Sequence, residues 1–277
     1  MDLRPISDAL GVEVLGLNAS VSLAPADAHR LREAFDQHHL LLLRDQDIDP
    51  AGQERFVATF GPLVDDLGDG ERSGAISNVG DEGGGSGPLP FHCDLSFTRS
   101  PVRAIALFAE VVPEAGTSTW FANATRAWTT LPAELRDQAS GRDVRHTLPL
   151  ASNMREARAR EVDLSDTDPY FDHPIPLRHP RTDRDVLFVT DLHSSEIVGL
   201  DSPSSRRLLD ALITHITASP HVYEHHWRAG DLMVWDNIAL QHARSDVSAV
   251  GPRTFRRNAI NDERIIELLP ELIAMGR

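Results

Sequence analysis

Residues 91–97 (FHCDLSF) contain the first pair of side chains whose types and spacing could do chemistry. His92 and Asp94 stand two positions apart, and every second side chain of an extended strand points the same way. The sequence therefore predicts that this imidazole and carboxylate face one site as two ligands of a metal ion. Cys93 lies between them, so we expect its thiol to pack on the opposite face.

His242 supplies a third candidate ligand. It ends the segment 235–242 (WDNIALQH), which follows a turn at Gly230 and Asp231. Two imidazoles and one carboxylate occupy one face of a metal ion and leave the other face open, which suits non-haem Fe(II) that activates O₂. Catalytic zinc accepts similar ligands, so these three residues alone fit both metals.

Two arginines follow His242 in a segment expected to be a strand. Arg253 and Arg257 are four positions apart, so both side chains face one side. A guanidinium near such a metal can bind a dicarboxylate in bidentate fashion. The alternative interpretation is a solvated strand edge that also includes Arg256.

The charge of the chain excludes several classes of protein. Its 277 residues include 42 acidic and 27 basic ones, a formal charge of −15 that opposes binding to nucleic acid. Every basic residue is Arg, which excludes lysine Schiff-base chemistry and the lysine of a phosphate-binding P-loop. Cys93 is the only cysteine, so neither an intramolecular disulfide nor a cysteine-rich zinc site can form.

The sequence pattern predicts neither a signal peptide nor a membrane span. Residues 1–5 lack the apolar core of a signal peptide, and no apolar run approaches the ~20 residues of a membrane span. We therefore expect a cytoplasmic protein without a membrane partner. Residues 1–277 contain no internal repeat and no linker, which predicts a single domain.

The expected elements describe an antiparallel β core with helices around it, because short apolar runs alternate with turn residues and do not follow a regular βαβ order. We expect helices at 26–39, from 49 to about 60, at 125–138, 203–217 and 263–275, and strands at 40–43, 75–79, 91–97, 105–112, 119–122, 186–190, 222–227, 232–235 and 253–260. The terminal helix carries an apolar stripe, which favours a homodimer or homotetramer. The glycine-rich segment 81–88 precedes a strand where a phosphate loop needs a helix, so we expect a mobile lid.

Several motifs, in this order and spacing, resemble the taurine/2,4-dichlorophenoxyacetate dioxygenase family of Fe(II)- and 2-oxoglutarate-dependent oxygenases. The resemblance covers nearly the whole chain and rests on residues 10–14 (LGVEV), 42–46 (LLRDQ), 60–63 (FGPL), 92–94 (HCD), 116–123 (GTSTWFAN), 179–180 (HP) and 230–242 (GDLMVWDNIALQH). It implies a mainly β fold with flanking helices, whose core is a double-stranded β-helix of the jelly-roll, cupin-like type.

The resemblance also assigns roles to residues. It implies that His92, Asp94 and His242 bind iron, and that Thr119 and Arg257 hold the distal carboxylate of 2-oxoglutarate with Arg253 beside them. Family members usually have a second glycine and an acidic or amide residue before this threonine, where this chain has Thr117 and Ser118. The local turn is therefore expected to differ.

The reaction that the resemblance implies consumes O₂ and 2-oxoglutarate, releases succinate and CO₂, and hydroxylates a C–H bond of a small molecule. If the attacked carbon carries an ether, sulfonate or sulfate group, the product can split. After residues 60–63, taurine-type members carry a histidine-bearing segment where this chain has VDDL, which disfavours taurine. A histidine at position 193 is similar to the branch of the family that acts on aryloxyalkanoates. Leu95 and Phe97 are expected to form an apolar side of the pocket. We therefore expect an anionic or aromatic-containing substrate.

Two alternatives differ in class from this interpretation. A zinc-dependent hydrolase could use the same His/Asp/His site and would be indifferent to 2-oxoglutarate. A non-catalytic β-helix protein that binds a small molecule would keep its affinity after loss of His92 and show no turnover.

Overall fold

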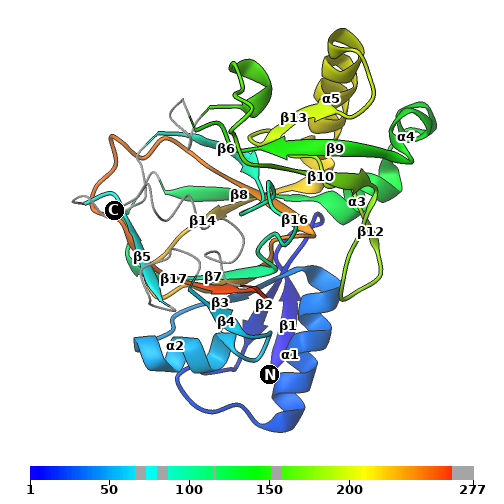
Figure 1. Ribbon diagram of the computed structural model, residues 1–277. Helices are drawn as coiled ribbons and strands as arrows, with labels where there is room; N and C mark the ends of the chain where they lie inside the picture. The colour runs from blue at the N-terminus through cyan, green and yellow to red at the C-terminus, as the bar shows by residue number, and fades with distance from the viewer. Residues whose placement is uncertain (66–72, 80–86, 115–116, 151–156, 264–277) are drawn as a thin grey trace.

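Two facing β-sheets form the centre of the protein in a computed structural model that describes residues 1–65, 73–79, 87–114, 117–150 and 157–263 (Figure 1). The main sheet has the strand order β1-β2-β3-β15-β7-β17-β4, with β5 also paired to β17, and the second sheet has the order β14-β8-β16-β6. All pairs in both sheets are antiparallel except β2 with β3. The expected mainly β fold with a jelly-roll core is confirmed.

The strands of the main sheet are β1 (Asp2–Pro5), β2 (Val12–Leu15), β3 (Leu40–Leu43), β4 (Leu63–Val64), β5 (Gly74–Ser77), β7 (Ala104–Val111), β15 (Leu232–Asp236) and β17 (Thr254–Ile260). Those of the second sheet are β6 (Leu89–His92), β8 (Ser118–Asn123), β14 (Val222–His226) and β16 (Leu240–Arg244). Two smaller sheets contain β10 (Tyr170–Ile175), β9 (Arg142–Thr147) and β13 (Ser194–Ile197), and β11 (Leu177–Arg178) and β12 (Asp185–Val186).

The alternation of side chains in β3 explains how one leucine run serves two layers. Leu40 and Leu42 pack into the cluster between the two sheets, whereas Leu41 and Leu43 pack on the outer face against the first two helices. Between the sheets, the Phe121 and Trp235 rings meet at 5.3 Å. Because β3 is buried on both faces, all four of its residues are apolar, as the run of leucines in the sequence indicates.

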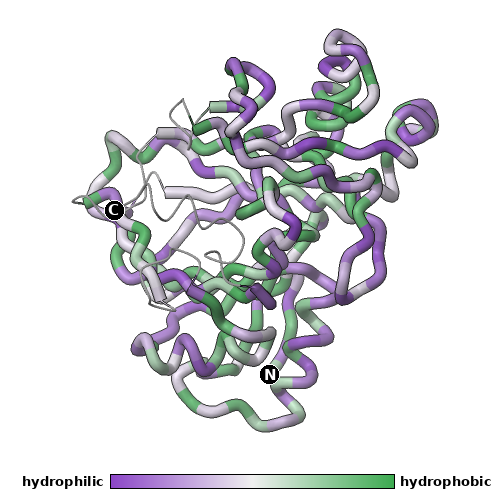
Figure 2. Tube along the Cα trace, in the orientation of Figure 1, coloured by the Kyte–Doolittle hydropathy of each residue, from purple (hydrophilic) through white to green (hydrophobic). Residues whose placement is uncertain are grey.

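Helices cover the outer faces of this core. They are α1 (Pro25–His38), α2 (Pro50–Val57), α3 (Ala124–Thr130), α4 (Ala133–Ala139) and α5 (Ser202–Ile216), with 3₁₀ turns η1 (Ala159–Glu161) and η2 (Ser219–His221). Figure 2 shows hydrophobic and hydrophilic residues alternating within single turns of α1 and α5, as expected for helices with one buried face. The side chain of Asp49 caps the start of α2, because its Oδ1 accepts a hydrogen bond from Gly52 N at 2.7 Å.

Three expected elements differ from the structure. The strand expected over 91–97 ends at His92, and the helix expected over 125–138 divides into α3 and α4, because Pro132 disfavours a helical conformation at the residue before it. Of the strand expected at 186–190, only Val186 lies in β12. Residues 264–275 of the expected terminal helix lie outside the described residues, as do residues 81–86 of the glycine-rich segment 81–88 that was expected to form a lid.

Across the parts of the chain listed above, no helix has the length and apolar character to cross a membrane.

Candidate metal centre and active site

Strand pairing in the second sheet brings His92 and His242 together. His92 ends β6, His242 lies within β16, and the two residues are direct partners in the antiparallel register. Directly opposed residues project from the same face of a sheet. The ring centroids are accordingly 4.1 Å apart, although half the chain separates the two residues in sequence.

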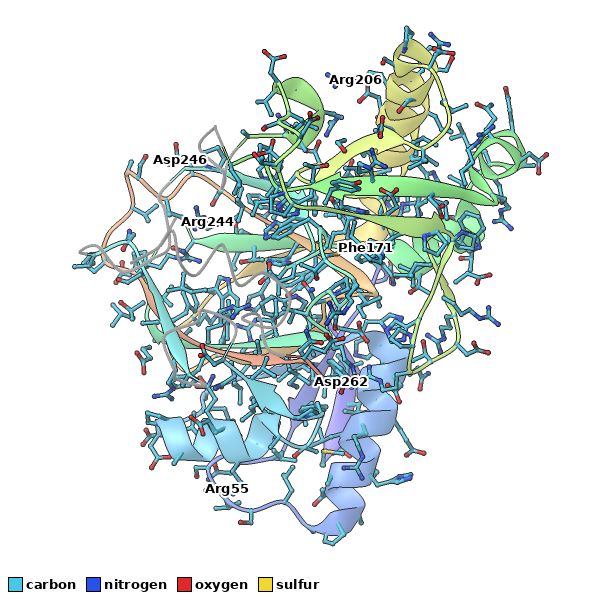
Figure 3. All side chains as sticks on the ribbon, in the orientation of Figure 1. Arg55, Phe171, Arg206, Arg244, Asp246 and Asp262 are labelled. Carbon is cyan, nitrogen blue, oxygen red and sulfur yellow. The ribbon has the colours of Figure 1, made fainter. Side chains whose placement is uncertain are left out.

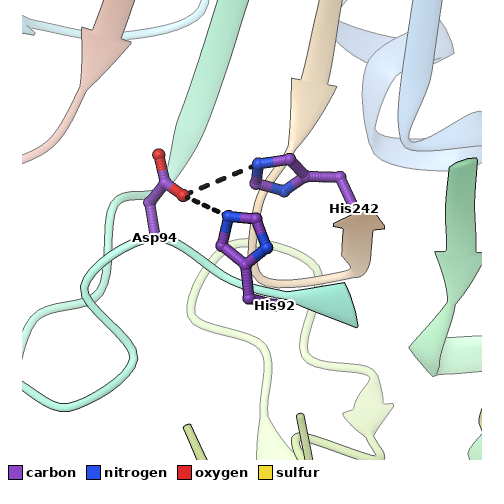
Figure 4. Close-up of side chains that lie close together, drawn as sticks. All are labelled: His92, Asp94 and His242. Carbon is purple, nitrogen blue, oxygen red and sulfur yellow. Dashed lines mark ion pairs between the residues drawn. The ribbon is translucent and has the colours of Figure 1, made fainter. Parts of the chain in front are cut away.

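Asp94 joins the two histidines from a turn and not from a strand. Its Oδ1 lies 3.2 Å from His92 Nε2 and 3.6 Å from His242 Nε2 (Figure 4). The alternation expected for an extended strand is therefore wrong for this pair, because β6 ends at His92 and the chain turns immediately afterwards. Cys93 is fully buried in the core as expected, with its thiol donating to Leu240 O.

These three side chains form the one candidate metal group within the described ranges. Each offers one ligand atom, and the ligand atoms lie within 4.8 Å of one another. Two imidazole nitrogens and one carboxylate oxygen are a donor set suited to a divalent first-row transition metal. His92 Nδ1 lies 2.9 Å from Pro90 O, a backbone contact that orients the ring so that Nε2 faces Asp94 and the other ligand atoms.

The protonation states suit metal binding. Burial disfavours the charged form of Asp94, but the hydrogen bond with His92 and the positive charge of Arg257 outweigh it and hold the pKa of this carboxyl well below its usual range. Burial, aided by the neighbouring His92, lowers the pKa of His242 to about 3. The centre therefore presents an ionised carboxylate and a neutral imidazole at neutral pH.

A cavity of about 580 Å³ opens over the three ligands. Among the described residues, those that line the cavity are largely apolar. The exceptions include the three candidate metal ligands and three arginines. The lining residues are Ala75, Ile76, Leu89, His92, Asp94, Leu95, Phe97, Ile105, Leu107, Thr119, His193, Trp235, His242, Arg244, Arg253 and Arg257. Every site residue expected from the sequence is therefore in this one cavity.

Arg257 lies next to the metal group. Its Nη2 donates to Asp94 Oδ2 at 2.7 Å, on the opposite carboxylate oxygen from the one that faces the histidines. The side chain of Arg257 is 6% exposed. A buried, charge-assisted bond of this kind fixes the orientation of the carboxylate.

Thr119 and Arg253 each contact one ring of the aromatic pair Trp227 and Phe255. The Arg253 guanidinium stacks over the Phe255 ring at 4.5 Å, and Phe255 meets Trp227 edge to face at 4.8 Å. Trp227 Nε1 donates to Thr119 Oγ1 at 2.9 Å. Burial, together with the charge of Arg244, lowers the pKa of Arg253 to about 10, so its guanidinium is charged at neutral pH.

Leu95, Phe97 and His193 form one side of the cavity. The His193 ring lies 5.1 Å from Phe97 and 6.1 Å from His92. Its Nδ1 is 3.0 Å from Ser96 Oγ, and burial, with a contribution from His92, lowers the pKa of His193 to about 3. This wall thus offers an apolar surface with one neutral imidazole.

Sequence reasoning missed Arg244 and Asn237. Figure 3 labels Arg244 near the end of β16, where it stands two positions after His242 and so projects from the same face of the strand. Its Nη2 donates to Gly87 O at 2.7 Å. The two-residue periodicity of a strand, counted onward from His242, would have identified Arg244. The side chain of Asn237 contacts the backbone of Asp94, and its type and spacing carried no signal of this contact.

Comparison with known proteins gives a consistent result. A curated (S)-phenoxypropionate/alpha-ketoglutarate-dioxygenase from Sphingobium herbicidovorans is 29% identical over 261 residues, 87% of this chain and 88% of that protein. An alpha-ketoglutarate-dependent 2,4-dichlorophenoxyacetate dioxygenase from Cupriavidus pinatubonensis is 29% identical over 290 residues, covering 93% and 96% of the two chains. The crystal structure of AAD-2 in complex with Mn(II) and N-oxalylglycine matches with a TM-score of 0.78 and 27% identity, over 94% of this chain and 97% of that one.

The sequence profile described as "Taurine catabolism dioxygenase TauD, TfdA family" matches residues 2–258. This span contains all of the candidate metal ligands and cavity arginines. The chain is therefore an enzyme of the taurine catabolism dioxygenase TauD, TfdA family, the family of the 2-oxoglutarate-dependent dioxygenases that it resembles.

Proposed function

We propose that this protein is an Fe(II)- and 2-oxoglutarate-dependent dioxygenase that hydroxylates a C–H bond of a small anionic or aromatic-containing molecule. One oxygen atom of O₂ enters the substrate and the other enters succinate as 2-oxoglutarate loses CO₂. The observation that carries the proposal is the convergence of His92, Asp94 and His242 in a cavity that also holds buried guanidinium groups. Bound iron and 2-oxoglutarate would supply the O₂-activating chemistry.

His92, Asp94 and His242 would hold the iron on one face. The ionised Asp94 offsets part of the metal's charge, and the neutral His242 offers a lone pair without losing a proton. The opposite face stays available to exchangeable ligands, as the two-histidine, one-carboxylate arrangement requires.

Thr119, Arg253 and Arg257 would bind 2-oxoglutarate. Thr119 and Arg253 flank the same aromatic pair, which suits the distal carboxylate, because one hydroxyl and one buried guanidinium can bind it together. Arg257 already donates to Asp94 and would contact the end nearer the metal. This geometry favours Arg253 at the distal carboxylate and Arg257 nearer the metal. The resemblance had implied Arg257 at the distal carboxylate, with Arg253 beside it.

The substrate would lie against Leu95, Phe97 and His193. This wall is mainly apolar, and the nearby Arg244 adds positive charge to the cavity. An aromatic or aliphatic body with a carboxylate or similar anionic group matches that combination. The phenoxypropionate and 2,4-dichlorophenoxyacetate dioxygenases among the relatives act on molecules of this class. If the substrate has an ether at the hydroxylated carbon, we expect the product to cleave.

The test is an anaerobic incubation of the full chain with Fe(II), 2-oxoglutarate and a panel of aryloxyalkanoates, other carboxylates, sulfonates, sulfates and amines, followed by O₂. We expect substrate-stimulated succinate that is lost when Fe(II) is omitted. Turnover with zinc that is indifferent to 2-oxoglutarate would instead indicate a hydrolase. Ligand binding that survives His92→Ala, with no turnover in any condition, would indicate a binding protein.

We further propose that residues 1–277 act as one catalytic domain and that the protein is cytoplasmic, without nucleic acid or membrane partners. We propose that it assembles as a homodimer or homotetramer. The support is the sequence composition and the apolar stripe at 263–275. Light scattering after size-exclusion chromatography tests the assembly: a mass of 30.5 kDa would contradict it.

A further inference from the structure

Asn237 contacts the metal group through the backbone of Asp94. Its Oδ1 accepts a hydrogen bond from Asp94 N at 3.1 Å, and its Nδ2 donates to Asp94 O at 3.2 Å. The same Nδ2 donates to Val102 O at 2.7 Å. A single side-chain amide therefore binds both the N–H and the C=O of a candidate metal ligand.

Asp94 depends on such support because no strand holds it. It follows the end of β6, and the next residue, Leu95, has a φ of 57°, in the left-handed region that non-glycine residues rarely adopt. The turn is closed at its far end by Val102 N, which donates to Asp94 O at 3.1 Å. The amide of Asn237 thus connects the start and the end of the loop that carries the carboxylate.

Asn237 is itself held firmly. Its side chain is fully buried, and its backbone N donates to Arg103 O at 3.0 Å. The preceding carboxylate, Asp236, accepts from Ile238 N and Ala239 N at 3.1 and 3.0 Å and so fixes the turn between β15 and β16. Because Asn237 binds the backbone of Asp94 and the turn leads into β16, which carries His242, this one turn connects to two of the three candidate metal ligands.

We propose that Asn237 is a positioning residue that sets the metal affinity of the His92, Asp94 and His242 centre by fixing the backbone of Asp94. This inference rests on the proposed function. Only an amide of this length both accepts from Asp94 N and donates to two carbonyl oxygens, since a carboxylate cannot donate and an alanine does neither. Loss of comparable outer partners of metal ligands typically weakens metal binding by roughly 10- to 100-fold.

The experiment titrates Mn(II) into the full-length, metal-free protein and follows free Mn(II) by electron paramagnetic resonance, a readout that needs no turnover. The variants are Asn237→Ala and the nearly isosteric Asn237→Asp. The matched control is Asn123→Ala, because Asn123 is also a buried amide bound to backbone on both sides: it donates to Ala9 O and accepts from Arg126 N, each at 2.9 Å, and is outside the described cavity lining. Thermal unfolding of each metal-free protein reports the purely structural cost.

We expect both Asn237 variants to bind Mn(II) at least about 10-fold more weakly than the wild type, whereas Asn123→Ala loses thermal stability but keeps the wild-type affinity. Equal Mn(II) affinities in the wild type and in whichever Asn237 variant folds would overturn the inference and leave the proposed function intact. Absence of Mn(II) binding by the wild type would overturn the metal centre and the role of Asn237 together.

Discussion

The Arg257 guanidinium donates to one oxygen of Asp94 at 2.7 Å while the other oxygen of the same carboxylate faces His92 and His242. The two oxygens thus have separate partners. Arg257 favours the ionised carboxylate and restricts its rotation, so one oxygen stays directed at the metal group.

Replacement of Arg257 should therefore weaken metal binding as well as turnover. We expect Arg257→Ala to lose roughly 10- to 100-fold in Mn(II) affinity, because Asp94 loses its charged partner and its fixed orientation. Arg257→Lys should recover part of this loss, since it restores the charge but not the planar geometry. Mn(II) titration of the three proteins measures the effect, and an unchanged affinity in Arg257→Ala would contradict it.

Replacement of Arg253 should act on 2-oxoglutarate and not on the metal. We expect Arg253→Ala to raise the KM for 2-oxoglutarate by about 100-fold or more, because a buried carboxylate would lose its cationic partner. The control is Arg256→Ala: Arg256 follows Arg253 by three positions in the sequence but bonds to Gln53 and Glu110, away from the cavity. Similar KM values for the two variants would refute the assignment of Arg253.

The stability of the metal-free protein should fall as the pH is lowered below about 6.5. Burial, aided by His92, lowers the folded-state pKa of His193 to about 3, so the unfolded chain binds a proton between these values that the folded chain does not. This histidine alone contributes a slope of up to about 1.4 kcal/mol per pH unit, with full stability present above pH ~6.5 and lost toward pH ~3.

Urea unfolding of the metal-free protein between pH 7.5 and 5 tests this dependence. We expect His193→Gln to have a shallower pH slope than the wild type, because one of the buried groups that gain a proton on unfolding is removed. His226→Gln is the matched control, since the side chain of His226 is 77% exposed. A wild-type slope in the His193 variant would show that the imidazole is accessible to protons in the folded protein.

Phe97 should influence the substrate without affecting the cosubstrate. We expect Phe97→Leu to raise the KM for the best substrate of the panel by about 10-fold through loss of aromatic contact area worth about 1 kcal/mol or more, while the KM for 2-oxoglutarate stays unchanged. Leucine limits the cavity that a smaller residue would leave beside Leu148. A parallel rise in both KM values would indicate general damage to the site.

Residue type and spacing in the sequence predict much of this protein. The doubly buried strand β3, from a run of four leucines, and the helix start at Asp49 and Pro50 both follow from local patterns. They could be predicted because side-chain periodicity and capping depend on neighbours within a few residues.

The tertiary structure decided the rest. A turn, and not a strand, directs Asp94 toward the histidines; Arg257, and not Arg253, bonds to its carboxylate; and Asn237 fixes its backbone. Each of these contacts joins segments that are far apart in the chain, with separations of 163 residues for Asp94 and Arg257 and 143 for Asp94 and Asn237. Local patterns do not encode such contacts, because they depend on how the turns and sheets pack in three dimensions.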